Sequence, residues 1–180
     1  MKLSSLFVIS IALIMVMGNN SIVMGQGPIF KDYNAIIVQE LEVPSGSPAP
    51  GSSGLQMAEK AVYQLKRYNE KYKLFEAIAE SKRSKEIPSG GKVLIIKGTV
   101  KEYTMSSVGR RIGRSFIPGG EYTGTAAFAA HYQFVDIENG KVIYETDLRT
   151  TSTGSNDTVE YAMDRNGEAL AKIVTKFKGK

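Results

Sequence analysis

The sequence predicts an α/β protein of the mixed α+β kind, in which a single small mixed β-sheet packs against two helices in the order β-α-β-β-β-α. Three observations predict this fold. Four segments have the apolar runs or two-residue alternation of strands, two longer segments have the three- and four-residue apolar spacing of helices, and an Asn-Gly pair joins the last two strands. A helix between the first two strands implies that they are parallel, with a right-handed crossover.

The first predicted strand is Tyr33 to Val43 (YNAIIVQELEV). Alternation divides it into two sides, with Ile37, Gln39, Leu41 and Val43 on one and Ile36, Val38, Glu40 and Glu42 on the other. The next segment, Pro44 to Gly54, contains only Pro, Gly, Ser and Ala. We expect a flexible surface loop at 44–54 that connects the strand to a helix, because these residues supply no side chain that anchors a loop.

The first predicted helix runs from Leu55 to about Ser84, a stretch without Gly or Pro. It should break before Pro88, because proline disfavours helical geometry in the preceding residue. Its apolar stripe has the helical spacing and consists of Ala58, Ala61, Val62, Leu65, Tyr68, Tyr72, Phe75, Ile78 and Ala79.

Three strands and a second helix follow. Lys92 to Thr104 begins with a continuous apolar run and then alternates, whereas Glu121 to Ile137 alternates throughout. Asn139-Gly140 predicts a two-residue type I′ turn into a strand from Lys141 to Arg149. In the long strand, one face would carry Tyr122, Gly124, Ala126, Phe128, Ala130, Tyr132 and Phe134. The last helix is predicted from about Thr158 to Phe177, with Ala162, Ala169, Ile173 and Phe177 on its inner face.

Residues 1–25 have the layout of a signal peptide. Lys2 is the only charge before an apolar run from Leu6 to Met17, which at 1.5 Å per residue spans about 18 Å, against the roughly 30 Å of a bilayer core. Val23 and Gly25 suit a cut before Gln26, which predicts a periplasmic or secreted product without a stable membrane span. An uncleaved signal anchor is the alternative. The sequence has no cysteine for lipid attachment.

The composition fits one folded domain over residues 26–180. Hydrophobic residues make up 42% and charged residues 23% of the chain, which is usual for a globular protein. The absence of cysteine excludes disulfide scaffolds and thiol chemistry. The net charge is +5, or +4 without Lys2, which is too small to indicate a nucleic-acid partner.

No catalytic residue, metal site or cofactor is predicted, and we expect a protein that is not an enzyme. Phosphate-loop, zinc, calcium and nucleophile-elbow motifs are all missing from the sequence. His131 is the single histidine, and its neighbours on its own strand face include no carboxylate, so a structural role is favoured. Glu145 and Asp147 share a strand face and form a weak candidate carboxylate pair, although one face of such a strand is usually wet.

The segment Val108 to Gly120 (VGRRIGRSFIPGG) departs most from the background. Three guanidinium groups, those of Arg110, Arg111 and Arg114, alternate with Gly109 and Gly113 between two predicted strands. Such a segment can hold an anion, and these five residues are the candidate binding site. The alternative is a solvated connection whose arginines favour solubility.

The chain resembles a family of exported bacterial proteins, mostly lipoproteins, known only as a domain of unknown function (DUF 4410-like). The matching segments are YNAIIVQELEV, VLIIKGTVKEY, GRRIGRSFIPGG and FVDIENGKVIYE, the last with Asp136 and Gly140. This member lacks the lipid-attachment cysteine of the lipoproteins. The resemblance implies a small mixed α/β domain in the cell envelope and supplies no activity or ligand.

Two functions of different kinds remain. The preferred hypothesis is a non-enzymatic binding or assembly factor that contacts an acidic polymer, a lipid head group or another envelope protein through the arginine and glycine segment. The alternative is a homo-oligomeric structural component of the envelope, because the small side chains from Thr125 to Ala130 allow close approach of another layer. A hydrolase of envelope polymers is less favoured, since no nucleophile and base can be assembled.

Overall fold

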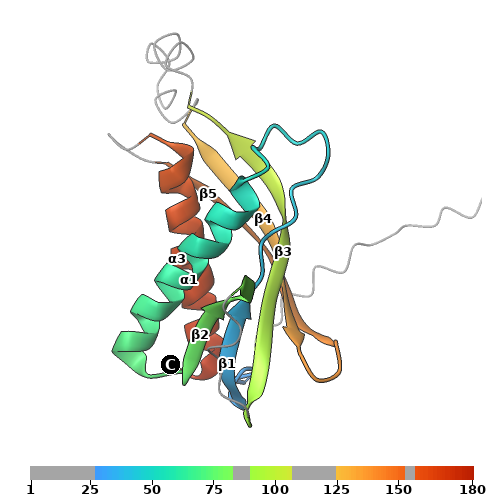
Figure 1. Cartoon of the computed structure of the whole chain (residues 1–180). Coiled ribbons are helices and arrows are strands. Elements are labelled where there is room, and N and C mark those ends of the chain that lie inside the picture. The colour runs from blue at the N-terminus through green and yellow to red at the C-terminus, as the bar shows by residue number, and fades with distance from the viewer. Residues whose placement is uncertain (1–26, 83–89, 107–124, 153–156) are drawn as a thin grey trace, which may run out of the picture.

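The structure is a computed structural model, and it describes residues 27–82, 90–106, 125–152 and 157–180. A five-stranded sheet has the strand order β2-β1-β3-β4-β5, and α1 and α3 lie side by side on one of its faces (Figure 1). The elements are β1 (Tyr33–Val38), α1 (Ser53–Tyr72), β2 (Ala77–Glu80), β3 (Lys92–Thr104), β4 (Ala127–Asp136), β5 (Val142–Thr151) and α3 (Val159–Lys178).

The predicted fold class is confirmed. β1 pairs in parallel with both β2 and β3, whereas β3, β4 and β5 form an antiparallel ladder, so the sheet is mixed. The predicted strands and helices occur in the predicted order, and the structure adds the short strand β2 between α1 and β3. The long sheet therefore combines a parallel half and an antiparallel half that meet at β3.

The first helix is shorter than predicted, and its expected C-terminal part forms β2. Lys73 adopts a left-handed conformation (φ 51°) that ends α1. The Asn69 side chain accepts hydrogen bonds from the backbone N–H groups of Leu74 and Phe75 at 2.7 and 2.8 Å. These bonds satisfy the backbone donors where the chain leaves the helix. Ile78 is buried, as predicted, although it lies in a strand and not in a helix. Short apolar runs fit both patterns, so the sequence alone does not distinguish them.

The first strand is also shorter than predicted, since regular pairing ends at Val38 and not at Val43. Beyond it the chain continues beside β3 through a local irregularity, with the Glu42 N–H donating to the Gly98 carbonyl at 2.9 Å. The irregularity inserts one residue, so Val38 and Leu41 both join the core beneath the helices. The prediction that these two residues lie on opposite sides is therefore wrong.

The loop predicted at 44–54 ends earlier, because α1 begins at Ser53. Gly54 packs against the Leu41 backbone so closely that a β-carbon there would overlap the Leu41 carbonyl. Ala49 reaches the core cluster and is buried, so the loop has one apolar anchor. Its flexibility stays a prediction, as do the signal peptide and the cut before Gln26, which lie outside the described residues.

The hairpin between β4 and β5 forms where predicted, but its turn is not type I′. The Asp136 N–H donates to the Lys141 carbonyl at 3.0 Å, which leaves a loop of four residues, 137–140, and among these only Gly140 has a positive φ (68°). The Asp136 carboxylate accepts the Glu138 N–H at 2.8 Å and the Tyr33 hydroxyl at 2.9 Å, and these two bonds hold the pKa of Asp136 below its usual value. This side-chain capping explains the longer turn.

Regular pairing in β4 begins at Ala127, while residues 121–124 of the predicted strand lie outside the described residues. The predicted face is confirmed from Ala126 to Phe134, since its members are all buried. The inner face of α3 is rotated from the prediction: Ala162 is buried, but Ala169 is only half-buried, and Ile173 and Phe177 pack at the margin. The fully buried face of this helix is made by Ala162, Met163, Asn166, Leu170, Ala171 and Val174.

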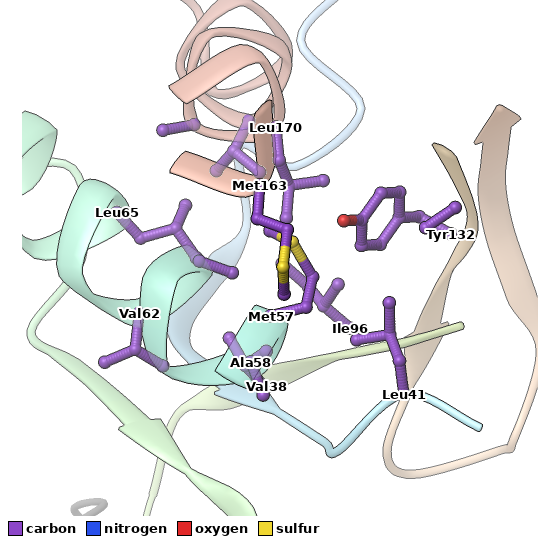
Figure 2. Packing of buried hydrophobic residues seen from close by; sticks show 14 of the residues in the cluster. Val38, Leu41, Met57, Ala58, Val62, Leu65, Ile96, Tyr132, Met163 and Leu170 are labelled. Carbon is purple, nitrogen blue, oxygen red and sulfur yellow. The ribbon is translucent and has the colours of Figure 1, made fainter. Parts of the chain in front are cut away.

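The core lies between the sheet and the helix layer. Met57 of α1 and Met163 of α3 meet above Ile96 of β3, as Figure 2 shows, and all three are fully buried. At one end, Phe30 stacks on Phe134 with a centroid separation of 5.0 Å, and Tyr144 contacts Phe177 at 4.7 Å. These aromatic contacts join the segment before β1 to the antiparallel half of the sheet and to α3.

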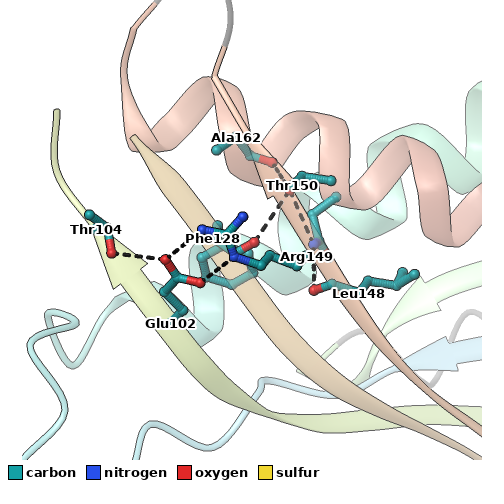
Figure 3. Close-up of polar contacts among 8 residues, drawn as sticks. Glu102, Thr104, Phe128, Leu148, Arg149, Thr150 and Ala162 are labelled. Carbon is teal, nitrogen blue, oxygen red and sulfur yellow. Dashed lines mark hydrogen bonds and ion pairs between the residues drawn. The ribbon is translucent and has the colours of Figure 1, made fainter. Parts of the chain in front are cut away.

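A buried polar network fixes α3 on the antiparallel half of the sheet. The Tyr132 hydroxyl donates to Asn166 Oδ1 at 2.7 Å, and Asn166 Nδ2 donates to the Leu148 carbonyl at 3.1 Å. Thr150 Oγ1 donates to the Ala162 carbonyl at 2.7 Å (Figure 3). Tyr132 is completely buried, and this burial raises the pKa of its hydroxyl. The bonds are directional, so they select one placement of the helix.

Tyr132→Phe is expected to destabilise the protein by about 1–3 kcal/mol, because the buried Asn166 oxygen loses its donor. Tyr161→Phe is the matched control, since Tyr161 is only half-buried, and it should change stability by less than about 0.5 kcal/mol. Urea unfolding followed by circular dichroism gives both values. Equal midpoints for the two variants would show that the network does not stabilise the fold.

Candidate functional site on the uncovered face of the sheet

Both helices pack on one face of the sheet, and within the described residues no helix covers the opposite face of β3, β4 and β5 (Figure 1). The ladder aligns its outward side chains in rows across the three strands. One row is Lys97, Gln133 and Glu145, the next is Thr99, His131 and Asp147, and a third is Glu102, Ala129 and Arg149. We call this surface of nine residues the outer polar face.

His131 lies between two carboxylates of β5. Its Nδ1 is 3.0 Å from Asp147 Oδ1 and its Nε2 is 3.8 Å from Glu145 Oε2. The strand face of His131 itself carries no carboxylate, as the sequence indicated, but both partners come from the neighbouring strand β5, which the sequence did not place beside it. Both ring nitrogens face carboxylates, so neither is directed at a nucleophile.

The predicted carboxylate pair, Glu145 and Asp147, is thus brought together with His131. Gln133 Nε2 also donates to Glu145 at 3.5 Å. The side chains of Glu145 and Asp147 are 61% and 78% exposed, so solvent keeps both in an ordinary polar setting. Within the described residues, no group of three or more potential ligands is arranged to hold a metal ion.

The strongest contact on the outer polar face joins its two margins. Arg149 Nε donates to Glu102 Oε2 at 2.7 Å and Arg149 Nη2 to Glu102 Oε1 at 3.1 Å, which forms a two-pronged ion pair across β4 (Figure 3). Thr104 Oγ1 donates to the same carboxylate at 3.1 Å. Chiefly through the Arg149 hydrogen bonds, the pKa of Glu102 is held below its usual value. Sequence analysis missed this pair, which only the strand register reveals.

The ion pair bridges over the small side chain of Ala129, which lies between Glu102 and Arg149 in the register. Ala127 follows in the next row and is buried. The polar side chains of the neighbouring strands thus occupy part of the predicted small-residue stretch, and close approach of another layer there stays a prediction. At this end of the face the charges of Glu102 and Arg149 balance each other.

Two cavities lie at the other edge of the sheet, beside β2. One has a volume of about 310 Å³ and is lined by Lys66, Asn69 and Glu70 of α1 and by residues 76–79. The second, of about 260 Å³, is lined by Leu55 and Ala58 of α1, by residues 38–40, and by Glu80, Ser81 and Lys82. A third, wide-open hollow of about 640 Å³ lies under the loop after β1. We call the first two together the β2–α1 groove.

The predicted binding residues Gly109, Arg110, Arg111, Gly113 and Arg114 lie outside the described residues. The structure does fix the strands on either side of them. Thr104 and Ala127 are paired in the ladder, at the opposite end of β3 and β4 from the hairpin.

Comparison with known proteins identifies the fold but no family. No protein-family model and no curated protein matches the sequence. A variant of the PelC dodecamer from Paraburkholderia phytofirmans matches with a TM-score of 0.55 and 13% identity, covering 87% of this chain and 96% of that chain. A second PelC dodecamer structure from this organism has a TM-score of 0.52 and 12% identity, covering 80% and 93%. The chain therefore shares the PelC fold.

Bacterial lipoproteins also occur among the similar structures. Lipoprotein GNA1162 from Neisseria meningitidis matches at 13% identity with a TM-score of 0.41, covering 79% of this chain and 99% of that chain. Membership of the particular family named above stays a prediction. Within the described residues, no helix is long and apolar enough to cross a membrane.

Glu102→Gln should lower stability at neutral pH by about 0.5–1 kcal/mol, because it removes the two-pronged pair with Arg149. The pKa of Glu102 is lowered in the folded protein, so its contribution is present above the ordinary glutamate pKa of about 4.3 and is lost as pH falls through the folded value. Unfolding measured from pH 7 to pH 3 should show the variant and the parent converging. A constant difference, or one equal to that of the exposed control Glu59→Gln, would contradict this assignment.

Proposed function

We propose that this protein is an exported, non-enzymatic component of the bacterial cell envelope that works as a homo-oligomer. The observation that carries the proposal is a sheet with one uncovered face and two strands at its edges, in a fold shared with PelC, whose solved structures are dodecamers. Closed rings of identical subunits need two different contact surfaces on each copy, and the two edge strands of one sheet, β2 and β5, supply such a pair.

A binding role is supported over catalysis by the outer polar face. His131 lies between the carboxylates of Glu145 and Asp147, and Glu102 is paired with Arg149, so these charged groups are directed at one another. Catalytic sites instead tend to combine a cavity with titratable groups in perturbed states. The two cavities of the β2–α1 groove are lined without histidine, and their ion pair, Lys82 with Glu40 at 3.7 Å, is largely exposed.

The protein comprising residues 26–180 is expected to form a discrete oligomer in solution. Size-exclusion chromatography with light scattering, over a wide concentration range and with and without mild detergent, measures its mass. A mass that is a fixed multiple of the protomer supports the proposal, whereas a monomer under all these conditions would overturn it.

The second candidate function is contact with an acidic polymer or lipid head group through Arg110, Arg111 and Arg114. The observation in its favour is the position of these residues in the chain, between two strands whose paired ends, Thr104 and Ala127, hold both ends of the segment. Three guanidinium groups within five residues of the sequence can add their attractions to a single anionic surface.

Replacing Arg110, Arg111 and Arg114 together by glutamine should weaken binding to anionic vesicles or acidic polysaccharide about a hundredfold, at about 1 kcal/mol per arginine. Binding of the parent should also weaken as salt is raised, because exposed charges are screened. Co-sedimentation at several salt concentrations tests both. Unfolding of the triple variant would mean that the arginines are structural, and unchanged binding would exclude them as the contact.

A further inference from the structure

We infer that the homo-oligomer is built head to tail, with the β5 edge of one copy added to the β2–α1 groove of the next. The inference deepens the proposed function and rests on it. Its starting point is that β5 and β2 are the two outermost strands of the described sheet. Each therefore presents backbone groups that have no neighbouring strand.

The pairing of β5 with β4 determines which backbone N–H and C=O groups of β5 lack a strand partner. The Ser152 N–H donates to the Ala126 carbonyl at 2.8 Å, so Ser152 is directed at β4. Backbone groups alternate in direction along a strand, and those of Glu145, Asp147, Arg149 and Thr151 therefore point away from β4. The Thr151 carbonyl is covered by Arg165 of α3, which donates to it at 3.0 Å. The open part of the edge is the stretch from Glu145 to Arg149.

The pairing of β2 with β1 identifies the backbone groups of β2 that lack a strand partner in the same way. The Glu76 N–H donates to the Asn34 carbonyl at 2.8 Å and is directed at β1. Alternation then directs the backbone of Ala77 and Ala79 away from β1, and both residues line the 310 Å³ cavity. The second cavity continues along Glu80 to Lys82. The β2–α1 groove thus follows the whole free edge of β2, with α1 as its other wall.

The directions of the two edge strands match. Two antiparallel steps make β5 run in the direction of β3, and β3, β1 and β2 are mutually parallel. Copies arranged around an axis along the strands would therefore place β5 of one copy parallel to β2 of the next. The sheet would continue from copy to copy, and pairing of this kind is heterologous and can close into a ring.

The helix layer supplies a second, independent observation. α3 packs over β4 and β5, and α1 packs over β2, so this arrangement also brings α3 of one copy toward α1 of the next. Tyr63 of α1 is 64% exposed, the most exposed large aromatic residue described. It lies three and seven residues before Lys66 and Glu70, which line the groove, and hence on the same stripe of the helix. Exposed tyrosines are frequent anchors of protein interfaces.

The chain has no cysteine, which makes cross-linking selective. Glu145→Cys marks the β5 edge and Ala77→Cys marks the β2 edge. With a short bismaleimide, a mixture of the two single variants should yield a cross-linked dimer, whereas each variant alone should remain uncross-linked. The double variant should yield a ladder of multimers, because every copy then carries both edges.

Dimers from Glu145→Cys alone would indicate two-fold pairing of β5 edges and overturn the inference. If light scattering establishes an oligomer but the mixture gives no cross-link, the inference is also overturned, while the proposed function stays intact. A monomer would overturn both.

Tyr63→Glu should raise the concentration at which the oligomer half-dissociates by about tenfold or more, without changing the secondary structure of the protomer. Ile137→Glu is the matched control, since Ile137 is also an exposed apolar residue (46%) but lies in the hairpin beside β3. Equal effects of the two variants, or no effect of Tyr63→Glu, would contradict the predicted place of α1 in the contact.

Discussion

The backbone ladder of β3 is the constraint on which the other elements depend. This strand is parallel to β1 on one side and antiparallel to β4 on the other, and it is the longest strand of the sheet. Leu94 and Ile96 face the helices, while Val93 and Ile95 join a second apolar cluster on the opposite face with Ala35 and Ile37. A strand that is apolar on both faces must be central, and this position forces the remaining strands to either side of it.

One glycine makes this close pairing possible. Gly98 lies in the middle of β3, and a β-carbon at this position would overlap the His131 carbonyl of β4. The Gly98 carbonyl also accepts the Glu42 N–H, so the same residue joins the antiparallel ladder to the chain leaving β1. A larger residue would push β4 away and disturb the rows of the outer polar face.

The two helices, α1 and α3, cover one face of the sheet, so the rest of the surface is where contacts with other molecules are expected. Tyr132, Asn166 and Thr150 form the buried polar network that places α3 on the covered face. On the opposite face His131 meets Asp147 and Arg149 pairs with Glu102, and the described sheet ends in two edge strands. Such a molecule is suited to contact other molecules through its edges, its face and the loops between strands.

The sequence by itself determined the fold class, β3, and the approximate extent of β5 and α3. The signals involved, which are alternation, helical spacing and the Thr158 cap, act over a few residues. In that cap the Thr158 hydroxyl accepts the Tyr161 N–H. Only the tertiary structure decided that the chain leaves the helix at Lys73 and forms β2, that Leu41 changes sides after a bulge, and that His131 meets Asp147. The physical reason is the same in each case. These outcomes depend on which strand lies beside which, and in what register, and strand pairing is a contact between residues distant in the sequence.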